Sequence, residues 1–214
     1  GGPPTYNAPY RGGKGYVYEG GLREPTIIRW PGKIKPGVVT DTPIINLDVL
    51  PTLVSLAGAN PATGIDGIDI SPLLLGKGTL PARQFKWHFP HYNNQGGRPA
   101  GAVRDGDWKF IKYYDTGEVE LYNLRSDIAE TKNLASADPE RAKQLGQQHE
   151  HWLNEIGAQR NTPNPDFDPA LFKKLYVDFD PSRPILRATS AEMATDMAEW
   201  RKLMNGVVAG RGGQ

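Results

Sequence analysis

Four strand-like segments joined by tight turns constrain the fold of this chain most strongly. They occupy residues 85–89, 100–104, 108–114 and 119–124. Asp105-Gly106 is a strong hairpin signal between the second and third segments, and the turn residues Asp115-Thr116-Gly117 precede the fourth. Strands joined by such short turns pair antiparallel, so we expect a four-stranded antiparallel meander.

An amphipathic helix follows the meander and is expected to cover one face of the sheet. Asp138 is a suitable N-cap, and Pro139 falls at the first helical position. The apolar stripe that follows at helical spacing consists of Ala142, Leu145, Trp152, Leu153 and Ile156. We expect a helix over residues 139–156, with Trp87, Trp108 and Trp152 forming the core between sheet and helix.

Upstream of the meander, the sequence predicts one strand and one helix. Residues 26–30 form a short β-branched run that Pro31-Gly32 ends. Residues 48–58 have a helix pattern, with Asp48 as the N-cap and Gly58 as the end. The expected buried face of this helix consists of Leu50, Leu53, Val54 and Ala57.

The C-terminal quarter of the chain predicts a linker and a last helix. The Asn- and Pro-rich residues 161–188 are expected to be the linker, and residues 205–214 a frayed tail. The helix is expected to begin at Thr189, where Glu192 completes a capping box, and to run to about Met204. Its expected buried side consists of Met193, Met197, Trp200 and Met204.

The charge balance and the absence of cysteine exclude several classes of protein. The chain carries 25 Lys and Arg against 24 Asp and Glu, whereas a nucleic-acid-binding domain is expected to have an excess of basic residues. With 0 Cys, disulfides, zinc–thiolate sites and cysteine nucleophiles are excluded. No apolar run approaches the ~20 residues of a membrane-spanning helix. We therefore expect neither a nucleic-acid partner nor a membrane span.

The segment Arg11-Gly12-Gly13-Lys14-Gly15 is the first candidate site. Glycines around a lysine let the backbone approach an anion closely, while the ammonium group supplies positive charge. The segment is not a phosphate-binding P-loop, because no Ser or Thr follows Lys14 and no strand precedes it. Taken alone, such a segment is more often a solvated turn than an anion site.

Residues 86–94, which contain His88 and His91, are the second candidate site. At the rim of a pocket, these histidines would hydrogen-bond a sugar or another alcohol. The alternative is a strand end whose histidines satisfy backbone groups. A zinc site is not expected, because no further ligand has suitable spacing.

Several other charged or polar residues are expected to have structural roles. Salt bridges are expected for Arg11 and Arg23, with Glu19 or Glu24, and for Arg104, with Asp105 or Asp107. His149 and His151 lie on the covering helix, where packing or surface roles are expected.

The order and spacing of several motifs resemble the type I sulfatases. Over residues 9–32 these motifs are Gly-Gly-Lys-Gly, Glu-Gly-Gly, Arg-x-Pro and Trp-Pro-Gly. Residues 47–58 look like the helix of that family at the same place, and residues 66–74 look like the loop after it. The meander, which ends Glu-Leu-Tyr-Asn-Leu at residues 120–124, is similar to the C-terminal subdomain of the family. The resemblance covers roughly residues 1–135.

This resemblance implies an α/β fold of the alkaline-phosphatase-like kind, of which this chain is the C-terminal part. Residues 1–80 would be the end of the catalytic sheet domain. Residues 81–160 would be a subdomain of four antiparallel strands with a packed helix, and residues 161–214 a linker and terminal helix. The activity implied is hydrolysis of a sulfate ester, with a sulfated carbohydrate favoured over a simple aryl sulfate. By resemblance to bacterial relatives, the whole protein is expected to be periplasmic or secreted.

The resemblance also implies roles for individual residues. Lys14 matches the family lysine that contacts the sulfate group, and His88 and His91 lie where family members carry substrate-recognition residues. The family nucleophile is a formylglycine made from a Cys or Ser in a Cys/Ser-x-Pro/Ala-x-Arg motif, and a bound calcium neutralises the sulfate oxygens. This chain has no such motif, since Ser182-Arg183-Pro184-Ile185-Leu186 ends in leucine instead of arginine. We therefore expect the nucleophile and the calcium ligands in a missing N-terminal portion, and no turnover from this chain alone.

Two alternatives to a sulfatase remain open from the sequence. One is a phosphoryl- or phosphonate-transfer enzyme of the same superfamily, which the motif around the nucleophile would distinguish. The other is a non-catalytic glycan-binding module, with Trp87, His88, Tyr92 and Trp108 as a platform for a sugar. Such a module would bind a sulfated glycan without any N-terminal partner.

Overall fold

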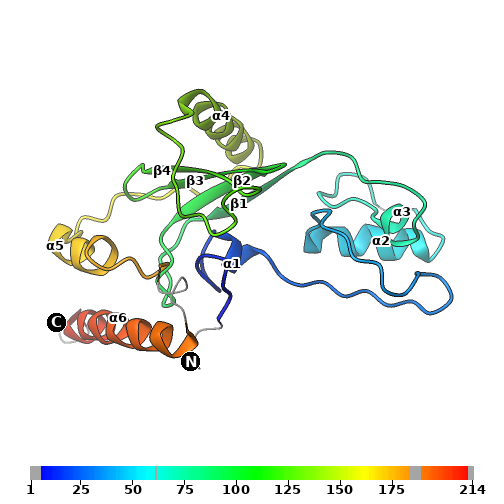
Figure 1. Cartoon of the computed structure of the whole chain (residues 1–214). Coiled ribbons are helices and arrows are strands. Elements are labelled where there is room, and N and C mark those ends of the chain that lie inside the picture. The colour runs from blue at the N-terminus through cyan, green and yellow to red at the C-terminus, as the bar shows by residue number, and fades with distance from the viewer. Residues whose placement is uncertain (1–5, 61, 184–188, 212–214) are drawn as a thin grey trace. The chain divides into compact units, whose positions relative to one another are not determined.

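The computed structural model describes residues 6–60, 62–183 and 189–211, and for Met193 and residues 207–211 it describes the backbone alone. Figure 1 shows the helices and strands of the chain. In the described ranges, no helix combines the length and the apolar character that crossing a membrane requires.

The chain divides into two compact units. One combines residues 1–24 with residues 84–214, and the other consists of residues 25–83. The N-terminal residues thus group with the sheet that lies far downstream in the sequence. The limits of the domains in the whole protein stay a prediction.

The predicted meander is present as a single antiparallel sheet. Its strands, in spatial order, are β1 (Gln84–Phe89), β2 (Ala100–Asp105), β3 (Trp108–Tyr113) and β4 (Val119–Asn123). The register places Val103 opposite Phe110 and Phe110 opposite Leu121, so these side chains share one face. Gly106 has a φ of +57°, as the tight hairpin predicted at this position requires.

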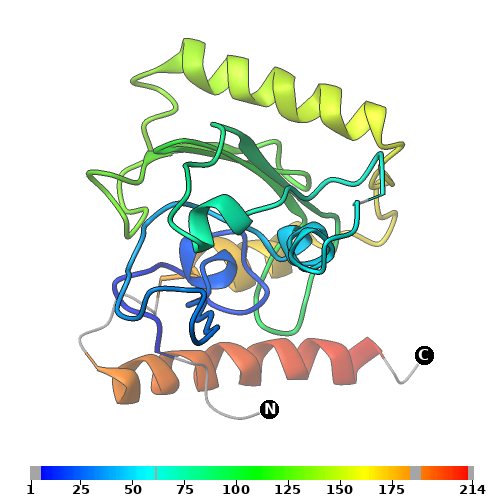
Figure 2. The same ribbon diagram turned by 90° about the vertical axis from the view of Figure 1, so that its right-hand side faces the viewer.

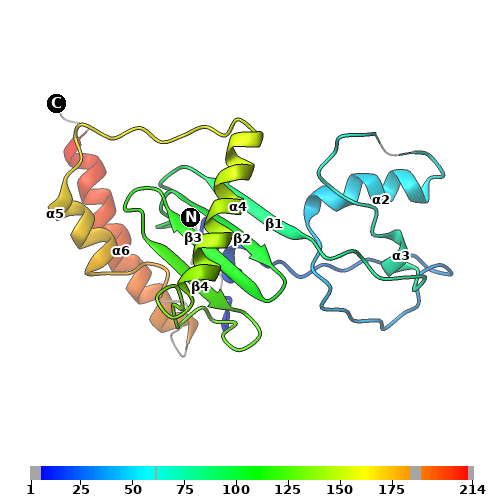
Figure 3. The ribbon, with the colours of Figure 1, turned by 90° about the horizontal axis from the view of Figure 1, so that it is seen from above.

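Helix α4 (Pro139–Glu155) lies across one face of the sheet, as predicted (Figures 1 and 3). Asp138 caps the start of the helix by accepting a hydrogen bond from the backbone N–H of Arg141 at 3.1 Å. The core beneath the helix consists of Val103, Phe110, Leu121, Ala142 and Leu145, and Trp108 packs against it as expected. Ile156, expected in the buried stripe, is 52% exposed because the helix ends before it.

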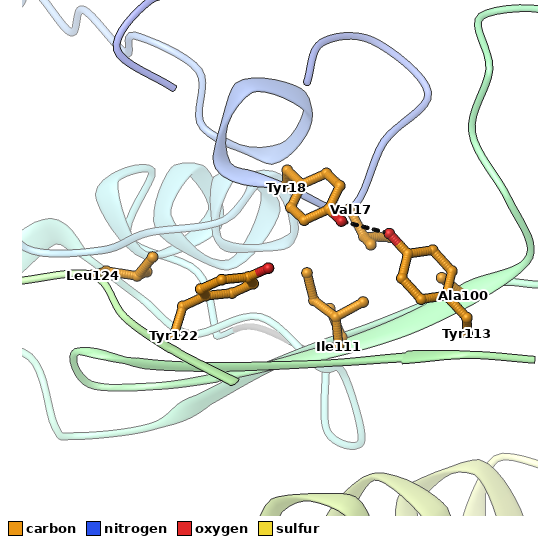
Figure 4. Packing of buried hydrophobic residues seen from close by; sticks show 8 residues of the cluster. Val17, Tyr18, Ala100, Ile111, Tyr113, Tyr122 and Leu124 are labelled. Atoms are coloured by element: carbon orange, nitrogen blue, oxygen red, sulfur yellow. Dashed lines mark hydrogen bonds between the residues drawn. The ribbon is translucent and has the colours of Figure 1, made fainter. Parts of the chain in front are cut away.

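The second face of the sheet is also buried, beneath the short helix α1 (Glu19–Leu22) and the residues that lead into it. Figure 4 shows this cluster, in which Val17 and Tyr18 pack against Ala100, Ile111, Tyr113, Tyr122 and Leu124. Trp87 packs against the same cluster, so the expectation that it lies beneath α4 is wrong. The reason is that alternate side chains of a strand point to opposite faces, and Trp87 falls on the α1 side.

The segment expected to be a linker contains helical turns that pack within the sheet unit. Helix α5 (Pro169–Phe172) leads directly into the turn η2 (Lys173–Val177). Trp200 of the last helix, α6 (Ser190–Arg211), is buried and donates its indole N–H to the backbone oxygen of Leu175 at 2.9 Å. Figure 2 shows α6 on the opposite side of the sheet from α4.

The last helix begins as predicted and ends later than predicted. Thr189 and Glu192 form the expected capping box, with the N–H of each donating to the side chain of the other at 3.1 and 3.2 Å. Met197 and Trp200 are buried as expected, whereas the side chain of Met193 lies outside the described residues. The helix continues to Arg211, so the frayed tail predicted from residue 205 is wrong over the described range.

Residues 25–83 are organised around one buried carboxylate, that of Asp48. Their helical elements are η1 (Asn46–Asp48), α2 (Val49–Leu56) and α3 (Ser71–Leu74). Asp48 accepts hydrogen bonds from the N–H groups of Ile45 at 2.9 Å and Ile68 at 3.0 Å, and it pairs with Arg83. Burial alone would raise the pKa of Asp48, but these partners hold it below its usual value. The carboxylate therefore joins separate segments and does not cap α2 as predicted.

Two further expectations for residues 25–83 are wrong. Residues 26–30 form no strand with any other described segment, and Ile27 is 93% exposed. Leu50 and Leu53, expected to be buried, are 63% and 60% exposed. The β-branched run and the helical apolar stripe are both typical of elements with a buried face. In the described part of this unit, no other element covers either face.

His149 gives the stability of the sheet unit a defined dependence on pH. Its ring is buried beside Phe110, Tyr114 and Trp152, and burial lowers its pKa to about 4. Between a pH of about 6.5 and a pH of about 4, the unfolded chain binds a proton at this position while the folded chain does not. Acidification from pH 7 to pH 5 is expected to lower the free energy of unfolding by about 2 kcal/mol through this group.

Urea denaturation of the wild type and of His149→Gln at both pH values measures this contribution. Because glutamine does not titrate, the loss of stability on acidification should be smaller in the variant by about 2 kcal/mol. The matched control is His151→Gln, which should behave as the wild type because the His151 side chain is 76% exposed. An unchanged pH dependence in His149→Gln would contradict a buried neutral imidazole.

Candidate functional site

The first candidate, Lys14, lies on a turn in the glycine-rich segment, residues 11–21. Gly12 and Gly15 adopt positive φ angles of +72° and +95°, a conformation that favours glycine at both positions. The side chain of Lys14 is exposed, and it forms no hydrogen bond or ion pair with any other residue that the structure describes. Its ammonium group is therefore available to an external anion.

A close fold of the backbone explains the Glu-Gly-Gly sequence at the end of this segment. The N–H of Gly20 donates to the backbone oxygen of Arg11 at 2.9 Å. A Cβ atom added to Gly20 would lie 2.5 Å from that oxygen, and one added to Gly21 would lie 2.2 Å from the backbone oxygen of Tyr16. Only glycine allows the two ends of the segment to approach this closely.

Buried charges hold the end of the glycine-rich segment on the sheet. Lys109 of β3 is 0% exposed, and its Nζ lies 3.0 Å from Oε1 of Glu19 and 2.9 Å from Oε1 of Glu130. Oε2 of Glu130 accepts a hydrogen bond from the N–H of Glu19 at 2.6 Å. Burial raises the pKa of Glu130, while Lys109 acts in the opposite direction. Glu130 also has a φ of +52°, a conformation that is uncommon for residues other than glycine.

Two arginines contact the same buried cluster from its edge. Arg104 places NH1 3.4 Å from Oε2 of Glu19, so its predicted pairing with Asp105 or Asp107 is wrong. Arg23 pairs with Glu19 at 3.8 Å, as predicted. The positive charges around Glu19 therefore come from three different elements.

Arg11 anchors the start of the glycine-rich segment to the C-terminal part of the chain. Its guanidinium group donates to Oγ of Ser182 and to Oδ2 of Asp180, each at 2.9 Å. The predicted pairing of Arg11 with Glu19 or Glu24 is therefore wrong. The partner is a carboxylate that lies 169 residues away in the sequence.

Residues 180–182 contact the chain on both sides of Lys14. The N–H of Gly12 donates to the backbone oxygen of Ser182 at 3.3 Å. The hydroxyl of Tyr16 donates to the backbone oxygen of Pro181 at 3.1 Å. The hydroxyl of Ser182 is buried and bonded to Arg11, which gives this serine a structural role.

The loop that carries His91 contacts the loop that carries Lys14. Nδ2 of Asn93 donates to the backbone oxygen of Gly15 at 2.7 Å, and Oδ1 of Asn93 accepts from the N–H of Gly97 at 3.1 Å. His91 is exposed, with its ring at the edge of Phe89 at 5.6 Å. The structure therefore brings the predicted sites at Lys14 and His91 onto adjoining loops.

His88 lies on the other face of the sheet, near the end of α4. Its Nδ1 is 2.8 Å from the hydroxyl of Tyr114, and its Nε2 is 2.8 Å from the backbone oxygen of Gln159. Both ring nitrogens thus have partners within the chain, as in the alternative considered from the sequence. The structure does not bring His88 next to Lys14, and a substrate contact of His88 stays a prediction.

This arrangement can bind an anion at Lys14, and the remaining chemistry of a hydrolase needs groups beyond it. Among the residues described, no group of three or more His, Asp or Glu is placed to hold a metal ion. The contacts of Asn93, Asp180 and Ser182 with the glycine-rich segment were not found from the sequence. Only Asn93 carried a signal, since it lies in the stretch singled out around His88 and His91.

Comparison with known proteins gives a consistent result. Residues 12–159 match the family described as N-sulphoglucosamine sulphohydrolase, C-terminal. Arylsulfatase A from Homo sapiens is 40% identical over 164 residues, which cover 64% of this chain and 32% of that protein. A sulfatase from Formosa agariphila is 36% identical over 148 residues, covering 64% of this chain and 27% of that protein.

A solved structure of a protein in complex with its substrate D-glucosamine-2-N,6-O-disulfate is also similar. It has a TM-score of 0.52 and 28% sequence identity, covering 60% of this chain and 27% of that one. The chain therefore spans about a third or less of the length of these relatives.

The buried cluster around Lys109 is expected to dominate the stability of the sheet unit. Lys109→Met should lower the free energy of unfolding by about 3–5 kcal/mol, because the buried Glu130 loses its paired cation and Glu19 loses the closest of its three. The matched control is Arg125→Ala, which removes one partner of an exposed pair with side chains 81% and 44% exposed. The control should lose less than about 1 kcal/mol. Chemical denaturation measures both, and equal losses would contradict the role of Lys109.

Proposed function

Because this chain belongs to the sulfatases, we propose that the protein it is part of hydrolyses sulfate esters. The proposal concerns the whole protein, since the chain spans about a third or less of its relatives. The single observation that supports it at the level of residues is that Lys14, on a glycine-rich turn inside the matched region, is exposed and pairs with no residue that the structure describes.

Lys14 is the proposed contact with the sulfate group. A compact ammonium group can follow negative charge as it builds up on the oxygens of the transferring group. The contacts of Asn93 with Gly15 and of Ser182 with Gly12 restrict the turn on either side, so the charge is presented from a fixed backbone. Such a group stabilises the transition state most when it needs no reorganisation.

The nucleophile and the metal are proposed to lie in a part of the protein outside this chain. In line with the resemblance to type I sulfatases, formylglycine would supply the nucleophile and calcium would neutralise sulfate oxygens. No residue of this chain is assigned to calcium, since the described side chains offer no suitable cluster. The contribution of this chain is the sulfate-binding cation and part of the substrate pocket.

A sulfated carbohydrate is the proposed substrate class. It is supported by the similarity to a structure that holds a disulfated glucosamine as its substrate. His91 is the proposed partner for sugar hydroxyls, and its exposure and the contact of its loop with that of Lys14 support this role. Substrate binding at His88 would require its ring to exchange the bond with Gln159 for one with the sugar.

The role of Lys14 is tested in the protein that contains this chain together with its upstream part. Lys14→Ala should reduce kcat/KM for a sulfate ester by roughly 100- to 1,000-fold, through loss of transition-state stabilisation. The matched control is Lys33→Ala, which removes another exposed lysine and should leave kcat/KM unchanged. If Lys14→Ala retained activity close to the wild type, the proposed contact with sulfate would be wrong.

The purified chain on its own is expected to release no sulfate from an aryl sulfate or a sulfated monosaccharide, because the nucleophile is proposed to lie outside it. Ion chromatography of the incubated mixture measures free sulfate directly. The longer protein serves as the positive control. Sulfate release by the isolated chain would show that the nucleophile lies within these residues.

A further inference from the structure

A cavity of about 330 Å³ opens beside the glycine-rich segment, within the unit that carries the sheet. One wall is formed by residues 96–98 and another by the C-terminal segment between Phe172 and Arg183. Tyr16 lines the cavity and joins these walls, since its hydroxyl lies 2.6 Å from the backbone oxygen of Gln95 and 3.1 Å from that of Pro181. The volume is at the low end of the roughly 300–1,000 Å³ of small-ligand pockets, which suits about one ring.

Part of the cavity lies outside the residues that match the sulfatase family. That match ends at residue 159, whereas Phe172, Tyr176 and Val177 belong to the downstream segment. This segment is held in place by the bonds of Asp180 and Ser182 to Arg11. The cavity is therefore an addition to the sulfate-binding region and is not explained by the proposed hydrolysis alone.

The walls offer aromatic faces beside a fixed planar cation. The rings of Phe172 and Tyr176 are 5.6 Å apart. The guanidinium group of Arg98 lies 4.1 Å from the ring centre of Tyr113 and 5.2 Å from that of Phe172. Asp115 holds Arg98 in this position at 2.8 Å. Aromatic faces combined with fixed polar groups bind ligands that have both an apolar face and hydrogen-bonding edges.

The floor of the cavity is a buried network of hydroxyl and carboxyl groups. The hydroxyl of Tyr18 donates to Oε2 of Glu120 at 2.8 Å and lies 2.7 Å from the hydroxyl of Tyr113. Burial raises the pKa of Glu120. A buried carboxyl group in this setting is a hydrogen-bonding partner for a neutral ligand.

The charges that line the cavity balance one another. Three arginines, Arg11, Arg98 and Arg183, face three acidic residues, Glu118, Glu120 and Asp180. Each of these arginines already pairs with a carboxylate, at distances between 2.8 and 2.9 Å. A sulfate group would find no unpaired cation here, in contrast to Lys14. Hydroxyl groups, which both donate and accept, match such a lining better.

We propose that this cavity binds one uncharged sugar unit of the saccharide whose sulfated unit lies at Lys14. The proposal rests on the proposed function for the identity of the neighbouring site. Tyr16, which lines the cavity, follows Lys14 by two residues, so the two sites lie along one continuous segment. The protein would thereby select saccharides in which an unsulfated unit accompanies the sulfated one.

Binding is measured by ¹⁵N–¹H NMR titration of the purified chain with N-acetylglucosamine, galactose and inorganic sulfate. We expect at least one neutral sugar to shift the amide signals of Gly96, Gly97 and Val177, which line the cavity. Inorganic sulfate should leave these signals unchanged. If neither sugar shifts them, or if sulfate alone does, the proposal is wrong.

A pair of tryptophan variants tests whether the shifts come from the cavity. Val177 lines the cavity and is 60% exposed, so Val177→Trp should narrow the entrance without disturbing the core, and weaken binding about tenfold or more. Lys174→Trp, on the same turn but outside the cavity lining, is the matched control and should bind as the wild type. Equal losses in both variants, or none in Val177→Trp, would overturn the proposal.

A second variant keeps the test decisive if Val177→Trp does not fold. Glu118→Ala removes an acceptor from a side chain that is 51% exposed at the cavity wall, and should weaken sugar binding severalfold with the circular dichroism spectrum unchanged. Unchanged affinity in this variant would count against the cavity as the binding site.

The longer protein separates this proposal from the proposed function. Val177→Trp should raise KM for a saccharide with one sulfated and one neutral unit, and leave kcat/KM for a simple aryl sulfate unchanged. A protein that binds neutral sugar but hydrolyses no sulfate ester would refute the function and leave the cavity assigned. Sulfate-ester hydrolysis with no effect of Val177→Trp on either substrate would refute the cavity and leave the function.

Discussion

Lys109 lies with no solvent exposure between the carboxylates of Glu19 and Glu130, and most of the arrangement around the glycine-rich segment depends on this contact. Without this lysine the buried carboxylate of Glu130 would have no counter-charge, which costs several kcal/mol. Helix α1 must therefore rest on β3, and the turn after β4 must come back to meet both. Once Glu19 is held there, the closely folded glycines bring Arg11 to the sheet, where the hydroxyl of Tyr122 accepts from it at 3.1 Å. The position of Lys14 is a consequence of these two anchors.

Two charged residues of the glycine-rich segment, Arg11 and Lys14, differ in burial and in pairing. Arg11 is 2% exposed and its hydrogen bonds are all made within the chain, whereas Lys14, three residues later, is exposed and unpaired within the described structure. The first holds the segment in place, and the second is left for a ligand. A binding site commonly combines such a fixed support with a free functional group. Lys14, which lies within the region that matches the family, is thus the residue with a proposed chemical role.

The local elements of the fold could be predicted from the sequence because their signals are local. The turn at Asp105-Gly106 and the cap at Asp138 are each encoded within a few residues, and the strands and helix that they delimit are present. Residues 26–30 and Leu50 carried equally clear patterns, yet they are exposed, because burial depends on a neighbour that a local pattern does not contain.

Long-range partners could not be predicted for a related reason. The sequence predicted a nearby glutamate as the partner of Arg11, but the structure pairs Arg11 with Asp180. Asp180 lies in a stretch whose Asn- and Pro-rich composition suggested a linker. Of the candidate site, Lys14 and the loop around His91 were found from the sequence, and the structure places them on adjoining loops. The cavity was not found, because its walls come from segments that only the fold brings together.

The backbone of Glu130 has a consequence for anyone who tries to engineer this protein. Its φ of +52° is a conformation that glycine adopts more easily than glutamate. A search for stabilising substitutions based on backbone geometry alone would therefore select Glu130→Gly. The same substitution would delete the carboxylate that neutralises Lys109 and accepts from the N–H of Glu19. Backbone geometry therefore favours glycine at position 130, whereas charge pairing requires glutamate. A design that considered only the backbone would remove the contact that holds Glu19 and helix α1 on the sheet.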